Sequence, residues 1–115
     1  MKTPQAVAAL GAIAHDTRLA LYRLLVERGP DGLPAGTIAD KLRLPPSSLT
    51  FHLQHLHRAG LITRRRLSRQ LFYAADFGAM NGLVAYLTEN CCGGAACDPV
   101  CLPAAAPSQP KRRSA

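Results

Sequence analysis

The sequence predicts a small, mainly helical (α+β) domain that carries one two-stranded β-ribbon, and three observations point to it. The 115 residues are 48% hydrophobic, with three Tyr, three Phe and no Trp, and such Ala- and Leu-rich composition favours helices. Apolar residues recur at helical spacing over most of the chain. Near residues 61–73 the pattern changes to β-forming residues around a run of arginines. We expect one domain over residues 1–90, a cysteine-rich segment over 91–101, and a disordered basic tail over 102–115.

Two helices are expected at the start of the chain. Pro4 opens the first, which runs to about Ile13 with Val7, Leu10 and residues 13–14 on one face. Asp16 is the predicted N-cap of the second. The apolar face of this second helix comprises Leu19, Leu21, Leu24, Leu25 and Val26, and the turn residues 29–32 end it.

Two further helices follow, separated by a tight turn. The first covers about residues 35–42, and the sequence Leu44-Pro45-Pro46 then forces the turn. Ser47 or Ser48 is expected to cap the next helix, which ends before Gly60 in a left-handed conformation. In this helix the residues Leu49, Leu53 and Leu56 recur at helical spacing and are expected to be buried.

The ribbon and a last helix complete the domain. Residues 61–63 and 71–73 are β-formers on either side of residues 64–70, which predicts two paired strands with arginines at the tip. Asp76 then caps a helix from Phe77 to about Asn90, with Met80, Leu83, Val84 and Leu87 on one face. Four helices, two strands and a fifth helix in this order make a winged helix-turn-helix.

The outward face of the fourth helix is the expected DNA-reading surface. Gln54 is suited to adenine, hydroxyl groups suit bases or phosphates, and Phe51 either packs on a thymine methyl or folds back against the wing. His52 is expected at the edge of the core rather than on DNA. The residues predicted to contact DNA from this helix are Ser47, Ser48, Thr50, Phe51, Gln54 and His55.

The charge of the chain agrees with a nucleic-acid partner. The net charge is +7, and Lys111, Arg112 and Arg113 of the tail account for three of these charges. On the ribbon, alternation places Arg64 and Arg66 on one side and Arg65 on the other. We predict that Arg64, Arg66 and Arg69 contact phosphates or the minor groove.

All four cysteines lie within eleven positions, as Cys91, Cys92, Cys97 and Cys101. A core does not cluster its thiols in this way, so the segment indicates a site for a thiophilic ion. Zinc in a four-cysteine site is one alternative, although the usual pairs spaced Cys-x₂-Cys are missing. A redox switch at the adjacent pair is another.

The pattern Leu49-Thr50-Phe51-His52-Leu53 with Ala59-Gly60-Leu61-Ile62, together with the stretch His15–Leu21, resembles the ArsR/SmtB repressors. The resemblance covers about residues 7–97. It implies a homodimer, formed by the first and last helices, that binds double-stranded operator DNA and leaves it when a metal or metalloid binds.

The resemblance also narrows the choice of inducer. The cysteine pair that many members carry on the third helix would fall near Pro34 and Gly36, and the zinc site of the last helix would need a His where Gly78 stands. The remaining cysteines resemble those of the arsenite-responsive subgroup. This implies that trivalent arsenic, As(III), is the inducer, with antimony, Sb(III), as a second candidate and zinc less favoured. Cys91, Cys92 and Cys97 are then the ligands, and Cys101 is a spare or fourth ligand.

Other functions are weaker candidates. No cofactor loop or thioredoxin-like Cys-x-x-Cys is present, so we predict that the protein is not an enzyme. A thiol metallochaperone is a remote alternative. No apolar run is long enough to cross a membrane, and residues 6–14 are Ala-rich and continue into a helical pattern, unlike a signal peptide. We therefore expect a cytoplasmic protein, with reduced thiols and no membrane partner.

Overall fold

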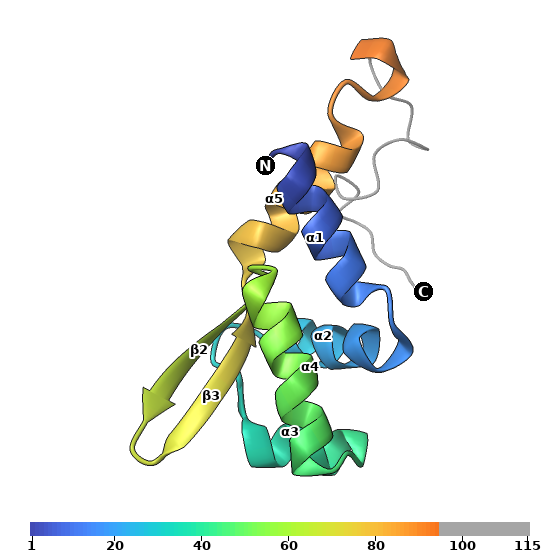
Figure 1. The fold of residues 1–115 in the computed structure, drawn as a ribbon. Coiled ribbons are helices and arrows are strands. Elements are labelled where there is room, and N and C mark those ends of the chain that lie inside the picture. Colours follow the sequence, from blue (N-terminus) through green and yellow to red (C-terminus); the bar gives the residue numbers. More distant parts are fainter. Residues whose placement is uncertain (95–115) are drawn as a thin grey trace.

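The computed structural model describes residues 1–94 and shows the predicted winged helix-turn-helix with one additional short strand (Figure 1). The elements are α1 (Thr3–Ile13), α2 (Asp16–Arg28), β1 (Leu33–Pro34), α3 (Ala35–Leu42), α4 (Pro46–Arg58), β2 (Ile62–Leu67), β3 (Gln70–Ala75), α5 (Phe77–Thr88) and a 3₁₀ turn (Cys91–Gly94). The predicted basic tail and most of the predicted cysteine segment lie outside the described residues.

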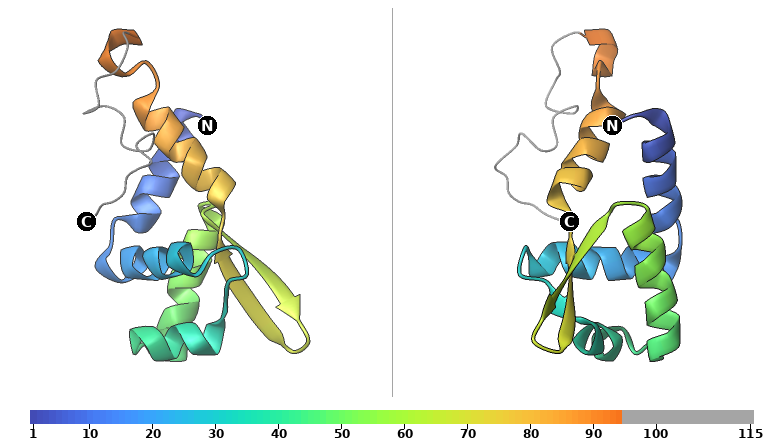
Figure 2. Two further views of the ribbon diagram at one scale, coloured as in Figure 1. Left: turned by 180° about the vertical axis from the view of Figure 1, so that it is seen from behind. Right: turned by 60° about the vertical axis from the view of Figure 1, so that its left-hand side comes forward.

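The elements divide into two ends joined by α2. Helices α1 and α5 lie side by side at one end, while α3, α4 and the ribbon occupy the other, as Figures 1 and 2 show. A hydrogen bond between the hydroxyl groups of Thr3 and Tyr86 joins α1 to α5. This arrangement separates the helices expected to dimerise from the helix-turn-helix and the wing. In the described part, no helix is long and apolar enough to span a membrane.

The sheet contains three antiparallel strands in the order β1-β3-β2. Strand β1 was not predicted, because two residues that include a proline give no strand pattern; Leu33 pairs with Tyr73 and Pro34 with Phe72. The ribbon is also longer than predicted. Arg64, Arg65 and Arg66 therefore lie within strand β2, and the hairpin tip is formed by residues 68–69.

The helix starts differ from the prediction in two places. His15 rather than Asp16 is the N-cap of α2, and its Nδ1 accepts a hydrogen bond from the Thr17 N–H at 3.1 Å. Pro45 occupies the N-cap position of α4, so neither Ser47 nor Ser48 caps that helix. Two other predicted capping residues are confirmed. Asp76 caps the start of α5, and Gly60 follows the end of α4 in a left-handed conformation with φ 80°.

The core joins α2, α3 and α4 to the base of the wing. Its most completely buried side chains are Leu21, Leu25, Ile38, Leu56 and Leu61. Leu19 was predicted to be buried but is exposed. Its neighbour Arg18, and not Leu19, lies on the side of α2 that faces the core. In α1 the small residues Ala6, Ala9 and Ala12 pack inward.

Candidate nucleic-acid interface

Helix α4 is held by three leucines, which fixes the face it presents to solvent. Leu49, Leu53 and Leu56 are at most 3% exposed, as the sequence predicted. Ser47, Thr50, Phe51, Gln54 and His55 are exposed, and Ser48 is half-buried. Thr50 donates its hydroxyl hydrogen to the Pro46 carbonyl at 2.9 Å, which leaves its oxygen able to accept. The predicted reading surface is therefore one continuous face of the helix.

Phe51 points outward from this face. Its side chain is 62% exposed, and its ring meets His52 and His55 edge-on, at centroid distances of 5.6 and 6.4 Å. The structure thus favours the outward orientation over the alternative in which the ring folds back against the wing. An exposed phenyl group is available to an apolar partner such as a thymine methyl.

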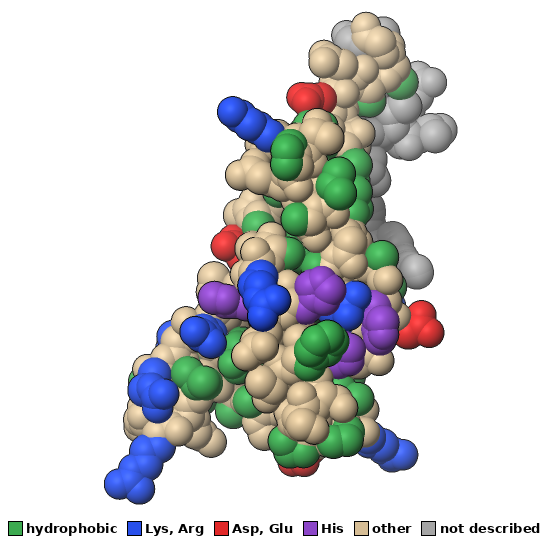
Figure 3. Space-filling model, in the orientation of Figure 1, with side chains coloured by type: hydrophobic (Ala, Val, Ile, Leu, Met, Phe, Trp, Pro, Cys, Tyr) green, Lys and Arg blue, Asp and Glu red, His purple; other side chains and the backbone are tan. Residues whose placement is uncertain are grey.

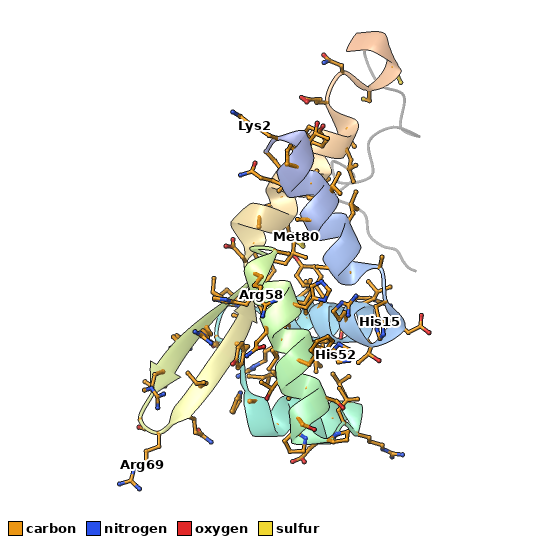
Figure 4. The ribbon with its side chains drawn as sticks, in the orientation of Figure 1. Lys2, His15, His52, Arg58, Arg69 and Met80 are labelled. Carbon is orange, nitrogen blue, oxygen red and sulfur yellow. The ribbon has the colours of Figure 1, made fainter. Side chains whose placement is uncertain are left out.

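The two sides of the ribbon have different roles. Arg65 donates from Nη2 to the Asp31 carbonyl at 2.8 Å, and its guanidinium lies 5.5 Å from the centre of the Phe72 ring. Arg64 and Arg66 are on the other side, as predicted, and form no ion pair or side-chain hydrogen bond within residues 1–94. Arg69 is exposed at the tip (Figure 4). Arg64, Arg66 and Arg69 are therefore available to an anion, whereas Arg65 is engaged within the fold.

Charged and imidazole side chains gather on one face. Figure 3 shows Lys, Arg and His along the wing and in a band across the middle of the molecule, around an exposed hydrophobic side chain. The α1–α5 end of the same face carries more hydrophobic side chains and few charges. The basic surface thus coincides with the helix-turn-helix and wing, the elements that contact DNA in this fold.

A junction between α1, α2 and α4 was not predicted from the sequence. Arg18 is 9% exposed and donates from Nε to the Ala12 carbonyl at 2.6 Å, so it caps the end of α1. The rings of His15 and His52 lie 5.1 Å apart (Figure 4), which ties the start of α2 to α4. No sequence signal marks Arg18 as buried, because a single arginine in a helix is normally exposed.

His52 lies at the edge of the core, as predicted. Its Nδ1 is buried and has no hydrogen-bond partner among the described residues. Burial lowers the pKa of His52, and the neighbouring His15, Arg18 and His55 lower it further. The lowered pKa favours the neutral form of the imidazole, which suits a side chain at the edge of the core.

The cysteine segment begins directly beyond α5. Cys91 is half-buried and Cys92 is exposed, and the turn they occupy contains left-handed residues, with φ 57° at Cys92 and 67° at Gly93. Cys97 and Cys101 lie outside the described residues. Within residues 1–94, no three His, Cys, Asp or Glu side chains are grouped as metal ligands. The described residues contain two cysteines, so a three-thiol site within one subunit needs a thiol from beyond Gly94.

Comparisons with known proteins agree with this architecture. Residues 13–65 match the family model described as a helix-turn-helix domain. Over 88 residues the chain is 28% identical to the transcriptional activator HlyU from Vibrio cholerae serotype O1, covering 76% of this chain and 79% of HlyU. The solved structure of HlyU from V. cholerae N16961 is 30% identical to this chain. The match covers 76% of this chain and 97% of the HlyU chain, with a TM-score of 0.60.

More distant structures share the fold. An ArsR-like transcriptional regulator from Rhodococcus sp. RHA1 is 20% identical, with 79% of this chain and 82% of the other covered and a TM-score of 0.66. A homodimeric winged helix-turn-helix DNA-binding domain from Mycobacterium bovis is 21% identical, with 83% and 88% covered and a TM-score of 0.60.

The named relatives are regulators of transcription, which confirms the prediction that the protein is not an enzyme. The exposed face of α4, the wing arginines and the likeness to HlyU over nearly the whole of that chain all lead to one assignment. The chain belongs to the same family of winged helix-turn-helix transcriptional regulators as HlyU.

Proposed function

We propose that the protein is a transcriptional repressor that binds operator DNA as a homodimer and is released when trivalent arsenic binds Cys91, Cys92 and Cys97. It would act in the cytoplasm, and its targets would be arsenic-resistance genes. The observation that carries the DNA-binding part is the outward face of α4 beside the exposed wing arginines. In this fold such a helix lies in the major groove.

The homodimer is supported by apolar side chains that the subunit leaves uncovered on two neighbouring helices. Val7 and Leu10 of α1 are 62% and 40% exposed, and Val84 and Leu87 of α5 are 46% and 58% exposed. Burial of these side chains against a second copy would remove them from water. The M. bovis domain with the same fold is homodimeric.

The arsenic part rests on the chemistry and position of the cysteines. Trivalent arsenic is soft and prefers three thiolates, so sulfur outcompetes oxygen or imidazole. Cys91 and Cys92 follow the last residue of α5, Thr88, by only three and four positions. An ion that closes the segment after Asn90 would bias the end of α5 and with it the spacing of the two α4 helices. A coupling free energy of about 1–3 kcal/mol suffices for release.

The test is a fluorescence-anisotropy titration of the full chain on a duplex recovered by selection from random-sequence DNA. Arsenite is expected to weaken binding by the wild type. The single variants Cys91→Ser, Cys92→Ser and Cys97→Ser should bind DNA and ignore arsenite, whereas Cys101→Ser should respond nearly as the wild type does. If none of the four variants changes the response, the arsenic proposal is wrong.

A zinc- or redox-responsive repressor that uses the same cysteines is the second candidate, and a thiol metallochaperone is a remote third. One of the similar solved structures is that of reduced HlyU from V. cholerae N16961, which makes oxidation a relevant condition to test. Zinc and an oxidant are therefore added in parallel arms of the same titration. Loss of response in Cys101→Ser as complete as in Cys92→Ser would favour a four-thiolate zinc site.

A further inference from the structure

A hollow lies between the second half of α4 and the base of the wing. Its volume is about 210 Å³, and its lining residues are Leu53, Gln54, His57 and Arg58 of α4 with Arg64 of β2 and Tyr73 of β3. Figure 4 places Arg58 near the end of α4, close to where the ribbon begins. The ribbon register sets Arg64 opposite Tyr73, so the side of the wing that faces α4 supplies both.

The lining of this hollow is cationic and uncompensated. Arg58, Arg64 and His57 are exposed, and none of the lining residues is acidic. In the part of the chain that the structure describes, none of these three side chains forms an ion pair or hydrogen bond. Tyr73 is only 8% exposed, and no described residue is hydrogen-bonded to its hydroxyl. Two guanidinium groups that line one space repel each other, and a shared anion would stabilise the arrangement.

The geometry of B-DNA indicates which anion arrives there. A recognition helix occupies the major groove, and a basic wing beside it reaches the adjacent minor groove. One sugar–phosphate strand separates these two grooves, so that strand has to pass between α4 and the wing. The hollow lies at this place and offers donors that suit a phosphodiester.

We propose that this hollow binds one backbone phosphate of the DNA, held by Arg58 and Arg64, with His57 and Tyr73 as further hydrogen-bond donors. The inference rests on the proposed DNA-binding function and adds Arg58, His57 and Tyr73 to its surface. Gln54 lines the same hollow, so the bound phosphate fixes the register of Gln54 against the bases.

The test replaces single phosphates of the selected duplex by uncharged methylphosphonates, one position at a time, and measures the affinity of the full-length protein. We expect a methylphosphonate at one position in each half-site to weaken binding by the wild type, and to weaken binding by Arg58→Ala much less, because Arg64 is then the only guanidinium left in the hollow. The log–log salt dependence of Arg58→Ala should be shallower by about one unit for each phosphate that the variant no longer binds. The order of preference among bases elsewhere in the site should not change.

Two variants serve as controls. Arg23→Ala removes the same charge from an exposed position on α2 outside the hollow. Each methylphosphonate should change its affinity for DNA as it changes that of the wild type. Arg58→Lys keeps the charge, and it should retain the salt slope even if Arg58→Ala is poorly folded. Inorganic phosphate alone, followed by the NMR signals of His57, tests whether a free anion is the true ligand.

The outcomes separate this inference from the proposed function. If the wild type binds no DNA, the proposed function itself fails. If the wild type binds DNA but Arg58→Ala has the same salt slope and is weakened by the same methylphosphonates as the wild type, the hollow is not a phosphate site. If inorganic phosphate binds the hollow while no methylphosphonate matters, the site serves a free anion and the proposal is overturned.

Discussion

At the scale of single residues, His52 is a group whose protonation opposes folding. The pKa of His52 is lowered in the folded protein, first by burial and then by His15, Arg18 and His55. The unfolded chain therefore binds the proton more readily, near the ordinary histidine pKa of about 6.5. Above that pH both states are neutral and the effect vanishes. As pH falls below it, stability is lost until the folded pKa is reached.

The corresponding prediction is that the thermal midpoint of the wild type falls from about pH 7.5 to about pH 5.5 more than that of His52→Phe. The variant keeps a ring beside His15 and cannot be protonated. Differential scanning calorimetry at several pH values measures the difference. His57→Gln, at an exposed position, controls for the loss of a histidine and should follow the wild type. Parallel curves for wild type and His52→Phe would contradict the prediction.

Gly32 gives a second prediction at this scale. It has φ 75°, and a Cβ added there would overlap the backbone carbonyl oxygen of Tyr73 in β3. Gly32→Ala therefore adds a backbone clash to the strain of a left-handed alanine, and we expect a loss of about 3 kcal/mol of unfolding free energy. Gly60→Ala, with φ 80° and no atom within 4 Å, carries only the strain and should lose about 1 kcal/mol. Urea denaturation compares the two variants, and equal losses would refute the clash.

The burial of single residues could be predicted from the sequence where it follows the periodicity of a helix. Leu49, Leu53 and Leu56 follow one face of a helix, so their inward position could be predicted. Periodicity does not identify a buried cation. Arg18 is buried where Leu19 was expected because its guanidinium donates to the Ala12 carbonyl, and only the fold brings these two groups together. The hollow between α4 and the wing likewise joins residues from three separate elements.

At the scale of elements, the wing has one engaged and one open side, which a matched pair of variants can separate. Arg66→Ala removes a charge from the open side, so the log–log salt dependence of DNA binding should fall by about one unit. Arg65→Ala removes the same charge from the side that contacts Asp31 and Phe72. It should leave the slope close to that of the wild type and reduce stability by about 1 kcal/mol. Equal slopes for Arg66→Ala and the wild type would mean that this side of the wing does not contact DNA.

The elements themselves were predictable to different degrees. Helices α3 and α5 begin where proline, turn and capping residues indicate, because those signals act over a few neighbouring residues. Strand β1 was not predictable, since two residues become a strand only through pairing with β3. For the same reason the arginines expected at a loop tip lie within β2, where cross-strand pairing extends the ribbon. Non-local pairing therefore accounts for the differences.

At the scale of the whole molecule, the subunit has a basic end and an end with uncovered apolar side chains. The exposed apolar residues of α1 and α5 lie on helices that pack side by side, away from the wing (Figure 1). In a two-fold symmetric dimer each of these residues would be buried twice, once in each subunit. The same two-fold axis would present both copies of α4 to a DNA site with matching symmetry.

The last prediction follows from this division. Leu87 is 58% exposed in the subunit, so Leu87→Glu leaves the core intact and places a charge where the proposed interface would be dry. We expect sedimentation to show a dimeric wild type and a monomeric variant at micromolar concentration, with unchanged far-ultraviolet circular dichroism. Affinity for the two-fold DNA site should fall about a hundredfold or more, because the two half-site contacts would no longer be linked. Leu19→Glu, at a leucine that is 44% exposed on α2, should remain dimeric and bind as the wild type does. A monomeric wild type, or a Leu87→Glu variant that stays dimeric, would show that the apolar end of α5 is not the interface.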